Sequence, residues 1–195
     1  MPELTPSQTV GPYLALGLTW PDGHLVVPED APGAIVVHGV VTDGAGEPVP
    51  DAVVETWQAD ADGYYDVQYP GQSEHRGRGR IRTAADGSFL FRSILAEAYP
   101  IPHDGPVGRM LEALGRHPWR PAHLHFMIRA EGYETLVTHV FRDGDQYLDS
   151  DAVFGVRSSL VAQWIRHDPG PTPDGGKSER PFYTLDFDFV LNPAP

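Results

Sequence analysis

Two histidines separated by one residue lie inside an apolar stretch, WRPAHLHF at residues 119–126. On a β-strand, side chains two positions apart point to the same face, and their origins lie about 6.6 Å apart. The imidazoles of His123 and His125 can therefore lean toward one metal ion. The same spacing also fits two core histidines, because a buried histidine usually finds a hydrogen-bond partner within the protein. The pair alone leaves both interpretations open.

Two loops contain tyrosines that can complete such a site, DADGYYDVQYPG at residues 60–71 and LAEAYPIPHDGPVG at residues 95–108. A tyrosine, whose usual pKa is about 10, ionises near neutral pH only beside a strongly polarising cation. Hard oxygen donors favour hard ions, and tyrosine serves as an iron ligand in catalase. Two tyrosines with two histidines therefore favour non-haem Fe(III) over zinc or copper. Tyrosines in such loops also commonly serve in packing or lie on the surface.

The composition excludes several classes of protein. The chain has 195 residues, no cysteine and a formal net charge of −13. Without cysteine there is no disulfide scaffold, thiolate catalysis or cysteine-type zinc site. The acidic charge argues against nucleic acid or an anionic membrane as a partner. No apolar run is long enough for a transmembrane helix. The start of the chain lacks the pattern of a secretory signal, so we expect a cytoplasmic location.

Turn residues and apolar spacing divide the chain into two parts. Residues 1–33 are rich in proline and aperiodic, and we expect them to form an N-terminal arm packed on the domain. Residues 34–195 carry short apolar runs between turn signals, which indicates an all-β, antiparallel β-sandwich with long loops and one short helix. The helix is expected at residues 107–117, and the strands at residues 34–43, 51–59, 121–129, 134–142, 158–167 and 182–191, with two more within 76–95.

Two of these connections look like hairpin turns. TDGAG predicts that residues 34–43 pair with residues 51–59, and AEGY predicts that residues 121–129 pair with residues 134–142. In the stretch 121–129 the residues alternate, with Ala122, Leu124, Phe126 and Ile128 on one face and His123, His125, Met127 and Arg129 on the other. This alternation predicts one face on the apolar core and the other in a polar site.

Four stretches resemble, in the right order, the intradiol ring-cleavage dioxygenases: WQADADGYYDVQ, RSILAEAYPIPHDGPVG, GRHPWRPAHLHF and THVFRDGDQYLDSDAVFGV. The resemblance runs from about residue 34 to the C-terminus, and residues 34–195 would form the catalytic β-sandwich. It is greatest to the hydroxyquinol 1,2-dioxygenases. It implies a non-haem Fe(III) enzyme that cleaves a catechol-type ring between its two hydroxyls with O2, giving a cis,cis-muconate-type diacid. Hydroxyquinol (1,2,4-trihydroxybenzene), which would give maleylacetate, is the first expected substrate.

The resemblance also implies roles for individual residues. The iron ligands would be Tyr65, Tyr99, His123 and His125. The family pattern leaves out Tyr64, although the residues alone do not separate it from Tyr65. Arg120 matches an arginine that stabilises negative charge on the substrate ring, since a preorganised cation is effective in a site with little water. Arg120 also fits a purely structural ion pair.

Further residues follow from the same matches. Tyr99, displaced by the substrate, would take a proton from it. His139 lies where catechol-type relatives carry glutamine and would hydrogen-bond near the reacting oxygens, although a core role also fits. Ile101 and Pro102 would form a wall of the ring pocket. Three N-terminal residues match the segment at the pocket mouth: Gly11, Pro12 and Tyr13.

Two alternatives remain at this point. The same chemistry on catechol or protocatechuate is the nearest, and TPSQTVGPY near the N-terminus resembles the α chain of protocatechuate dioxygenases. Those α chains have lost the iron ligands, whereas all four are present here. The long N-terminal helical region that forms the dimer in catechol and hydroxyquinol dioxygenases is not recognisable, yet we still expect a homo-oligomer. A transthyretin-like β-sandwich that binds a ligand without catalysis is the alternative from another class.

Overall fold

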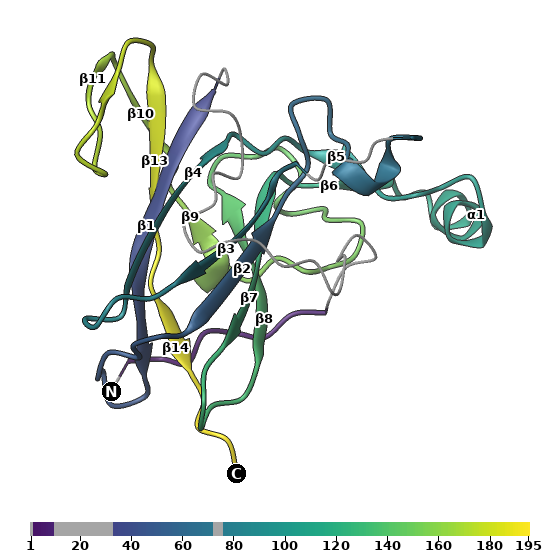
Figure 1. The fold of residues 1–195 in the computed structure, drawn as a ribbon. Coiled ribbons are helices and arrows are strands. Elements are labelled where there is room, and N and C mark those ends of the chain that lie inside the picture. Colours follow the sequence, from purple (N-terminus) through teal and green to yellow (C-terminus); the bar gives the residue numbers. More distant parts are fainter. Residues whose placement is uncertain (1, 10–32, 72–75) are drawn as a thin grey trace.

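Two five-stranded sheets pack face to face in the computed structural model, which describes residues 2–9, 33–71 and 76–195. Figure 1 shows the first sheet at the left and the second in the centre, with the small strands β5 (Tyr99–Pro100) and β6 (Trp119–Arg120) and the helix α1 (Pro106–Ala113) at the right. Over the described residues, the sequence prediction of an all-β sandwich with long loops and one short helix is confirmed.

The first sheet is built around β1 (Ala34–Asp43), whose valines and isoleucine are typical of buried strands. β1 pairs antiparallel with β4 (Ser88–Ile94) and parallel with β13 (Phe182–Asp186) and β14 (Phe189–Leu191). β10 (Ile165–His167) extends this sheet beside β13. The sheet contributes no residue to the predicted iron site and serves as one wall of the core.

The second sheet has the order β3-β2-β7-β8-β9. Its strands are β3 (Arg78–Arg82), β2 (Val53–Trp57), β7 (His123–Arg129), β8 (Leu136–Arg142) and β9 (Val161–Ala162). β7 lies in the middle, antiparallel to β2 and β8, while β8 and β9 run parallel. The predicted hairpin between residues 121–129 and 134–142 is confirmed by this register, in which His125 lies opposite His139.

Apolar side chains from both sheets form the main core. From β7 it takes Leu124, Phe126 and Ile128, which meet Phe189 and neighbouring residues of the first sheet. A second, smaller cluster lies on the other face of the second sheet and includes Trp57, Tyr65, Tyr99, Met127 and Val137. β7 is therefore covered on both faces, and the predicted alternation separates its core residues from its histidines.

Short elements complete the described chain. They are the 3-10 helices η1 (Asp66–Gln68) and η2 (Ser158–Leu160), the helix α1 (Pro106–Ala113), and the small pair β11 (Gly170–Pro171) with β12 (Lys177–Ser178). The first described residues lie along the sandwich, where the Thr5 amide donates to the Val190 carbonyl and the Gln8 amide donates to the Val137 carbonyl. Across residues 2–9, 33–71 and 76–195, no helix is both long and apolar enough to cross a lipid bilayer.

Four details differ from the sequence predictions. The stretch 158–167, expected as one strand, is divided into the 3-10 helix η2 (Ser158–Leu160), β9 in the second sheet and β10 in the first, because the chain crosses between the sheets there. The expected hairpin between residues 34–43 and 51–59 is wrong, because β1 and β2 belong to different sheets and the turn carries the chain across the core. The helix ends at Ala113 rather than at residue 117, and Gly115 follows with a φ of 63°, a conformation that glycine adopts easily. The stretch 182–191 is divided into β13 and β14, with Asp188 accepting a hydrogen bond from the Val40 amide in between.

Candidate metal centre

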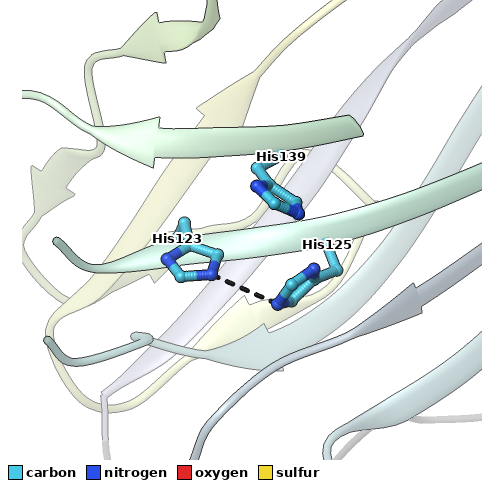
Figure 2. Close-up of side chains that lie close together, drawn as sticks. All are labelled: His123, His125 and His139. Atoms are coloured by element: carbon cyan, nitrogen blue, oxygen red, sulfur yellow. Dashed lines mark hydrogen bonds between the residues drawn. The ribbon is translucent and has the colours of Figure 1, made fainter. Parts of the chain in front are cut away.

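Three histidines converge on the outer face of the second sheet, the face turned away from the main core. His123 and His125 extend from β7, and His139 extends from β8 directly opposite His125. Figure 2 shows their rings turned toward one another, with a close contact between His123 and His125. All three are buried, and one ring nitrogen from each lies within 4.8 Å of the others. Strand periodicity and hairpin register together produce this cluster.

His123 is oriented by the backbone. Its Nδ1 lies 2.6 Å from the carbonyl oxygen of Pro121, so Nδ1 must donate the hydrogen. In the neutral ring Nε2 is then left as an acceptor, and the Arg120 guanidinium donates to it over 3.2 Å. A histidine held in this way presents an unprotonated nitrogen to the centre of the cluster, as a metal ligand must.

His125 is held between an indole and a phenol. Its ring stacks on that of Trp57 with 4.8 Å between centroids and an interplanar angle of 10°. Its Nε2 lies 2.9 Å from the Tyr65 hydroxyl and 3.2 Å from Nε2 of His123. Its Nδ1 is buried without a hydrogen-bond partner among the described residues. The stacking fixes the plane of the ring, so that Nε2 points at the other donors.

Tyr65 reaches the cluster from the loop after β2. Asp60 closes a turn by accepting from the amides of Asp62 and Tyr64, and Gly63 completes it with a φ of 82°. A Cβ at Gly63 would lie 3.3 Å from Cβ of Tyr99, so the glycine lets the two tyrosine segments come together. After the turn, Tyr65 is fully buried.

An ion pair next to Tyr65 anchors its loop. The Asp66 carboxylate accepts from Nε of Arg78 at 2.8 and 2.9 Å and lies 2.6 Å from Nη2 of the same guanidinium. Both side chains are buried beside η1. Arg78 begins β3, the edge strand of the second sheet. The pair therefore ties η1, which directly follows Tyr65, to the edge of that sheet.

Tyr99 and Arg120 meet across the small β5–β6 ladder, where they are register partners. The Tyr99 ring lies 5.3 Å from the Tyr65 ring and 5.5 Å from the His123 ring, measured between centroids. Arg120 is 4 % exposed, and its guanidinium contacts Nε2 of His123. Residues separated by more than fifty positions in the chain thus form one group of phenols, imidazoles and a guanidinium.

Burial determines the protonation of this group. It raises the pKa of Tyr65 well above its usual value, with the neighbouring Tyr99 adding to the effect. It lowers the pKa of His123 and of His125 well below their usual values, reinforced by Arg120 at His123 and by His139 at His125. Burial, with Arg120, also lowers the pKa of His139 to about 3. The histidines are therefore neutral near pH 7, and Tyr65 needs a strongly polarising cation to become a phenolate.

The donor set fits a ferric ion. Two ligand atoms that each lie about 2.1 Å from one metal ion are at most about 4.2 Å apart, and the contacts Tyr65–His125 and His123–His125 are both shorter than this. Neutral imidazoles and hard phenol oxygens suit Fe(III). Both ring nitrogens of His139 are buried without a partner among the described residues, which leaves a polar group free to face a ligand.

The other predicted site residues differ in how deeply they are buried and in whether the structure describes them. Ile101 is partly buried and packs against the cluster that contains Tyr65 and Tyr99, whereas Pro102 is exposed. Tyr64, which the sequence did not separate from Tyr65, is 52 % exposed. Gly11, Pro12 and Tyr13 lie outside the described residues.

Sequence reasoning missed two residues that shape the site, Trp57 behind His125 and Asp151 beside Arg120. Trp57 lies within the predicted strand 51–59 and pairs with His125 in β7, so strand register was the available signal. Asp151 lies 31 positions after Arg120, and no periodicity links the two.

Comparisons with known proteins identify the same family that the sequence motifs resemble. The profile of a family described as Dioxygenase matches residues 19–193. The 6-chlorohydroxyquinol 1,2-dioxygenase of Cupriavidus pinatubonensis is 64 % identical over 82 % of this chain and 54 % of its own length. The hydroxyquinol 1,2-dioxygenase of Nocardioides simplex is 52 % identical over 81 % of this chain and 54 % of its own.

A solved structure agrees with these matches. The crystal structure of hydroxyquinol 1,2-dioxygenase from Pseudomonas putida DLL-E4 superposes with a TM-score of 0.88 and 41 % identity, covering 98 % of this chain and 67 % of that one. The chain spans about half the length of the curated relatives it matches. The comparisons give no support to the alternative of a non-catalytic binding module.

Proposed function

The chain belongs to the intradiol ring-cleavage dioxygenase family, and from this membership we propose that it cleaves a hydroxylated catechol between its two adjacent hydroxyls, using O2 and non-haem Fe(III). Hydroxyquinol is the proposed substrate and maleylacetate the product. The observation that carries the proposal is the burial of two tyrosines and two histidines in one cluster, although they come from three separate stretches of the chain.

Tyr65, Tyr99, His123 and His125 would hold the iron. Bound Fe(III) would supply a Lewis acid that binds both diol oxygens and draws electron density from the ring. The imidazoles meet the first requirement for ligation, because burial keeps them neutral near pH 7. Trp57 and the Pro121 carbonyl hold the two rings in place, so little reorganisation is needed when a cation binds.

Two other side chains would act on the substrate. Tyr99 lies at the edge of the ligand cluster, at the β5–β6 ladder, and its phenolate oxygen would take a proton from a diol hydroxyl. Arg120 would stabilise the negative charge that then develops on the ring. Burial opposes a charged guanidinium, but hydrogen bonds and charge from Asp151 and Tyr99 outweigh it and raise the pKa of Arg120. Arg120 therefore stays cationic throughout the working pH range.

His139 is the proposed polar contact for substrate oxygens. Its ring is 4.3 Å from that of His125 between centroids, and neither nitrogen has a partner among the described residues. A buried polar group without a partner costs stability, so a substrate oxygen that pairs with it is bound favourably. Ile101, packed beside the ligand cluster, would form part of the apolar wall for the ring, with Pro102 next to it. Gly11, Pro12 and Tyr13 remain proposed for the pocket mouth.

Substrate choice is tested by measuring O2 uptake of the iron-loaded protein with hydroxyquinol, catechol and protocatechuate under identical conditions. We expect the highest kcat/KM with hydroxyquinol and one O2 consumed per ring. Brisk turnover of protocatechuate beside negligible turnover of hydroxyquinol would reverse the substrate assignment. No turnover of any diol by fully loaded protein would refute the catalytic proposal.

A homo-oligomeric assembly and a cytoplasmic location complete the proposal. Light scattering of the purified chain, measured during size-exclusion chromatography, tests the first. A mass equal to one chain of 21.4 kDa at all concentrations would contradict it.

A further inference from the structure

The guanidinium of Arg120 is held along one edge by a single buried carboxylate, that of Asp151. Asp151 is 3 % exposed, and its Oδ1 accepts from Nε of Arg120 at 3.1 Å while its Oδ2 lies 3.3 Å from Nη2. These contacts occupy one edge of the guanidinium. The remaining Nη1 then contacts Nε2 of His123 at 3.2 Å. Two bonds on one edge fix the plane of the guanidinium, and so they fix the direction in which Nη1 points.

The Asp151 carboxylate is itself fixed by the turn at residues 150–155. Its Oδ2 accepts from the Gly155 amide at 2.8 Å, and its Oδ1 accepts from the Val153 amide at 3.4 Å. The Ala152 amide donates to the Trp119 carbonyl, which joins the turn to β6 next to Arg120. Every one of the contacts to the carboxylate comes from a donor. An ionised aspartate can accept all of them, whereas an amide of the same shape cannot.

The backbone of this turn is under strain. Phe154 has a φ of 56°, a region that bulky residues seldom adopt, yet its side chain is 72 % exposed. The Arg116 guanidinium covers its ring at 3.6 Å and donates to the Asp151 carbonyl over 2.8 Å. This conformation accompanies the orientation of the next amide, Gly155, toward the carboxylate. Backbone strain that persists at an exposed residue indicates that the contacts of the turn require this backbone geometry.

Gly155 shows how closely the turn approaches the guanidinium. A Cβ at this position would lie 2.9 Å from Nη2 of Arg120 and 3.1 Å from Oδ2 of Asp151. Cβ atoms essentially never come closer than 3.0 Å to a non-bonded heavy atom of a residue elsewhere in the chain. Any side chain here would therefore push the guanidinium or the carboxylate out of place.

We propose that the turn at residues 150–155 is a positioning device for the reaction, in which Asp151 and the absence of a side chain at Gly155 set the direction of the Arg120 guanidinium toward the substrate. The inference rests on the proposed function, because the value of a fixed Arg120 lies in stabilising charge on the ring. Asp151 is a positioning residue that acts through Arg120. Its charge also balances the guanidinium, so the buried site carries no unpaired cation.

Two variants separate positioning from charge. Asp151→Asn removes the charge and leaves two donors, one from Arg120 and one amide of the turn, facing an amide NH2. Gly155→Ala keeps both charges and displaces the guanidinium by contact. We expect both to lower kcat on hydroxyquinol about 10- to 100-fold, with a smaller change in KM and with iron content equal to that of the wild type.

A matched control lies in the first sheet. Asp174 accepts from Arg92, and both side chains of that pair are mostly buried. Asp174→Asn removes an arginine–aspartate pair of similar kind on the opposite side of the sandwich, and it should leave kcat, KM and iron content unchanged. A loss of activity in this variant equal to that of Asp151→Asn would show a general effect on folding and would overturn the positioning role.

Crystal structures of the iron-loaded wild type and the two variants give a readout that does not depend on turnover. We expect the Arg120 guanidinium to shift, in both variants, away from the position that it has in the iron-loaded wild type. A guanidinium that stays in place, an unchanged kcat, or iron lost together with activity would each overturn the inference. If the wild type turns over no diol, the proposed function fails, and the structures still decide whether the turn positions Arg120.

Discussion

Strand β7 offers a comparison within a single element. One face carries Leu124, Phe126 and Ile128, and the other carries His123, His125 and Met127, followed by the exposed Arg129. Apart from Arg129, each of these residues is at most 6 % exposed. The inner face meets the first sheet, and each large apolar side chain buried there stabilises the fold by about 1.5–3 kcal/mol. The outer face buries imidazoles, and each buried polar group without a full set of partners costs about 1–3 kcal/mol.

The two faces differ in what burial achieves. On the inner face, burial stabilises the fold, and the only requirement on a side chain there is that it is apolar and has a suitable volume and shape. On the outer face it removes water from two imidazoles and keeps them neutral, which suits them to ligate a cation. The unpartnered nitrogens of His125 and His139 carry a cost that the inner face does not have. A strand that accepts this cost on one face only is best explained by a site built for a ligand there.

The largest expected effect distinguishes two of the proposed iron ligands, His123 and Tyr99. His123→Ala should reduce iron affinity by more than about 100-fold and abolish turnover, since one nitrogen ligand and its fixed orientation are lost. Tyr99→Phe should retain much of the iron and yet lose most of the turnover, because the proposed proton acceptor is gone. Iron analysis by mass spectrometry and O2 uptake measure the two effects. Equal iron loss in both variants would contradict the separate role of Tyr99.

The inner face should respond in the opposite way. Ile128→Ala removes part of a fully buried side chain and should lower the free energy of unfolding by about 2–5 kcal/mol. Ile128 lies three positions from His125 and points away from it, so kcat and iron content of the folded protein should stay near wild type. Urea unfolding together with O2 uptake tests this. A fall in kcat without a fall in stability would mean that the faces are not independent.

A smaller effect is expected at His139, the outer-face residue proposed to contact the substrate. His139→Gln keeps a hydrogen-bonding side chain but changes its reach, and we expect a loss of about tenfold in kcat/KM for hydroxyquinol, equivalent to one hydrogen bond. Iron content should remain that of the wild type, since His139 is not a proposed ligand. Steady-state kinetics on hydroxyquinol and catechol reveal the change. Loss of iron in this variant would make His139 a ligand instead.

The smallest effect is expected for an ion pair at the place where the outer face of the second sheet reaches solvent. Glu55 on β2 and Arg129 at the end of β7 form an ion pair on this face, with the Arg129 side chain 44 % exposed. Glu55→Ala should change the free energy of unfolding by less than about 1 kcal/mol, because exposed pairs contribute little, and kcat should not change. A kinetic effect comparable to that of His139→Gln would extend the functional part of the face beyond the histidines.

Local pattern was enough to predict the division of β7 into two faces, because alternation in a strand depends on neighbouring residues alone. The β7–β8 hairpin followed from the turn between two such strands, whereas the register that places His139 opposite His125 is given by the structure. The hairpin between β1 and β2 failed, since a turn sequence fits both a hairpin and a crossing between sheets, and the core decides which occurs.

Sequence patterns could not predict the contacts between residues that are far apart in the chain. Tyr64 and Tyr65 are adjacent and of the same type, and only the turn at Gly63 places one outside and the other in the cluster. The partnership of Arg120 with Asp151 depends on how the 150–155 turn packs on β6. That the four donors ligate iron remains a prediction, supported by their burial and mutual distances.

We propose that the outer face of β7, together with Tyr65 and Tyr99, forms a ferric site with tyrosinate ligands. This site can be detected in the visible spectrum while the iron-free protein is titrated with Fe(III). We expect a broad tyrosinate-to-iron charge-transfer band that grows to one equivalent per chain, then stops, and is absent from a Tyr65→Phe, Tyr99→Phe double variant. Colourless binding of iron, or a band that the double variant retains, would contradict it.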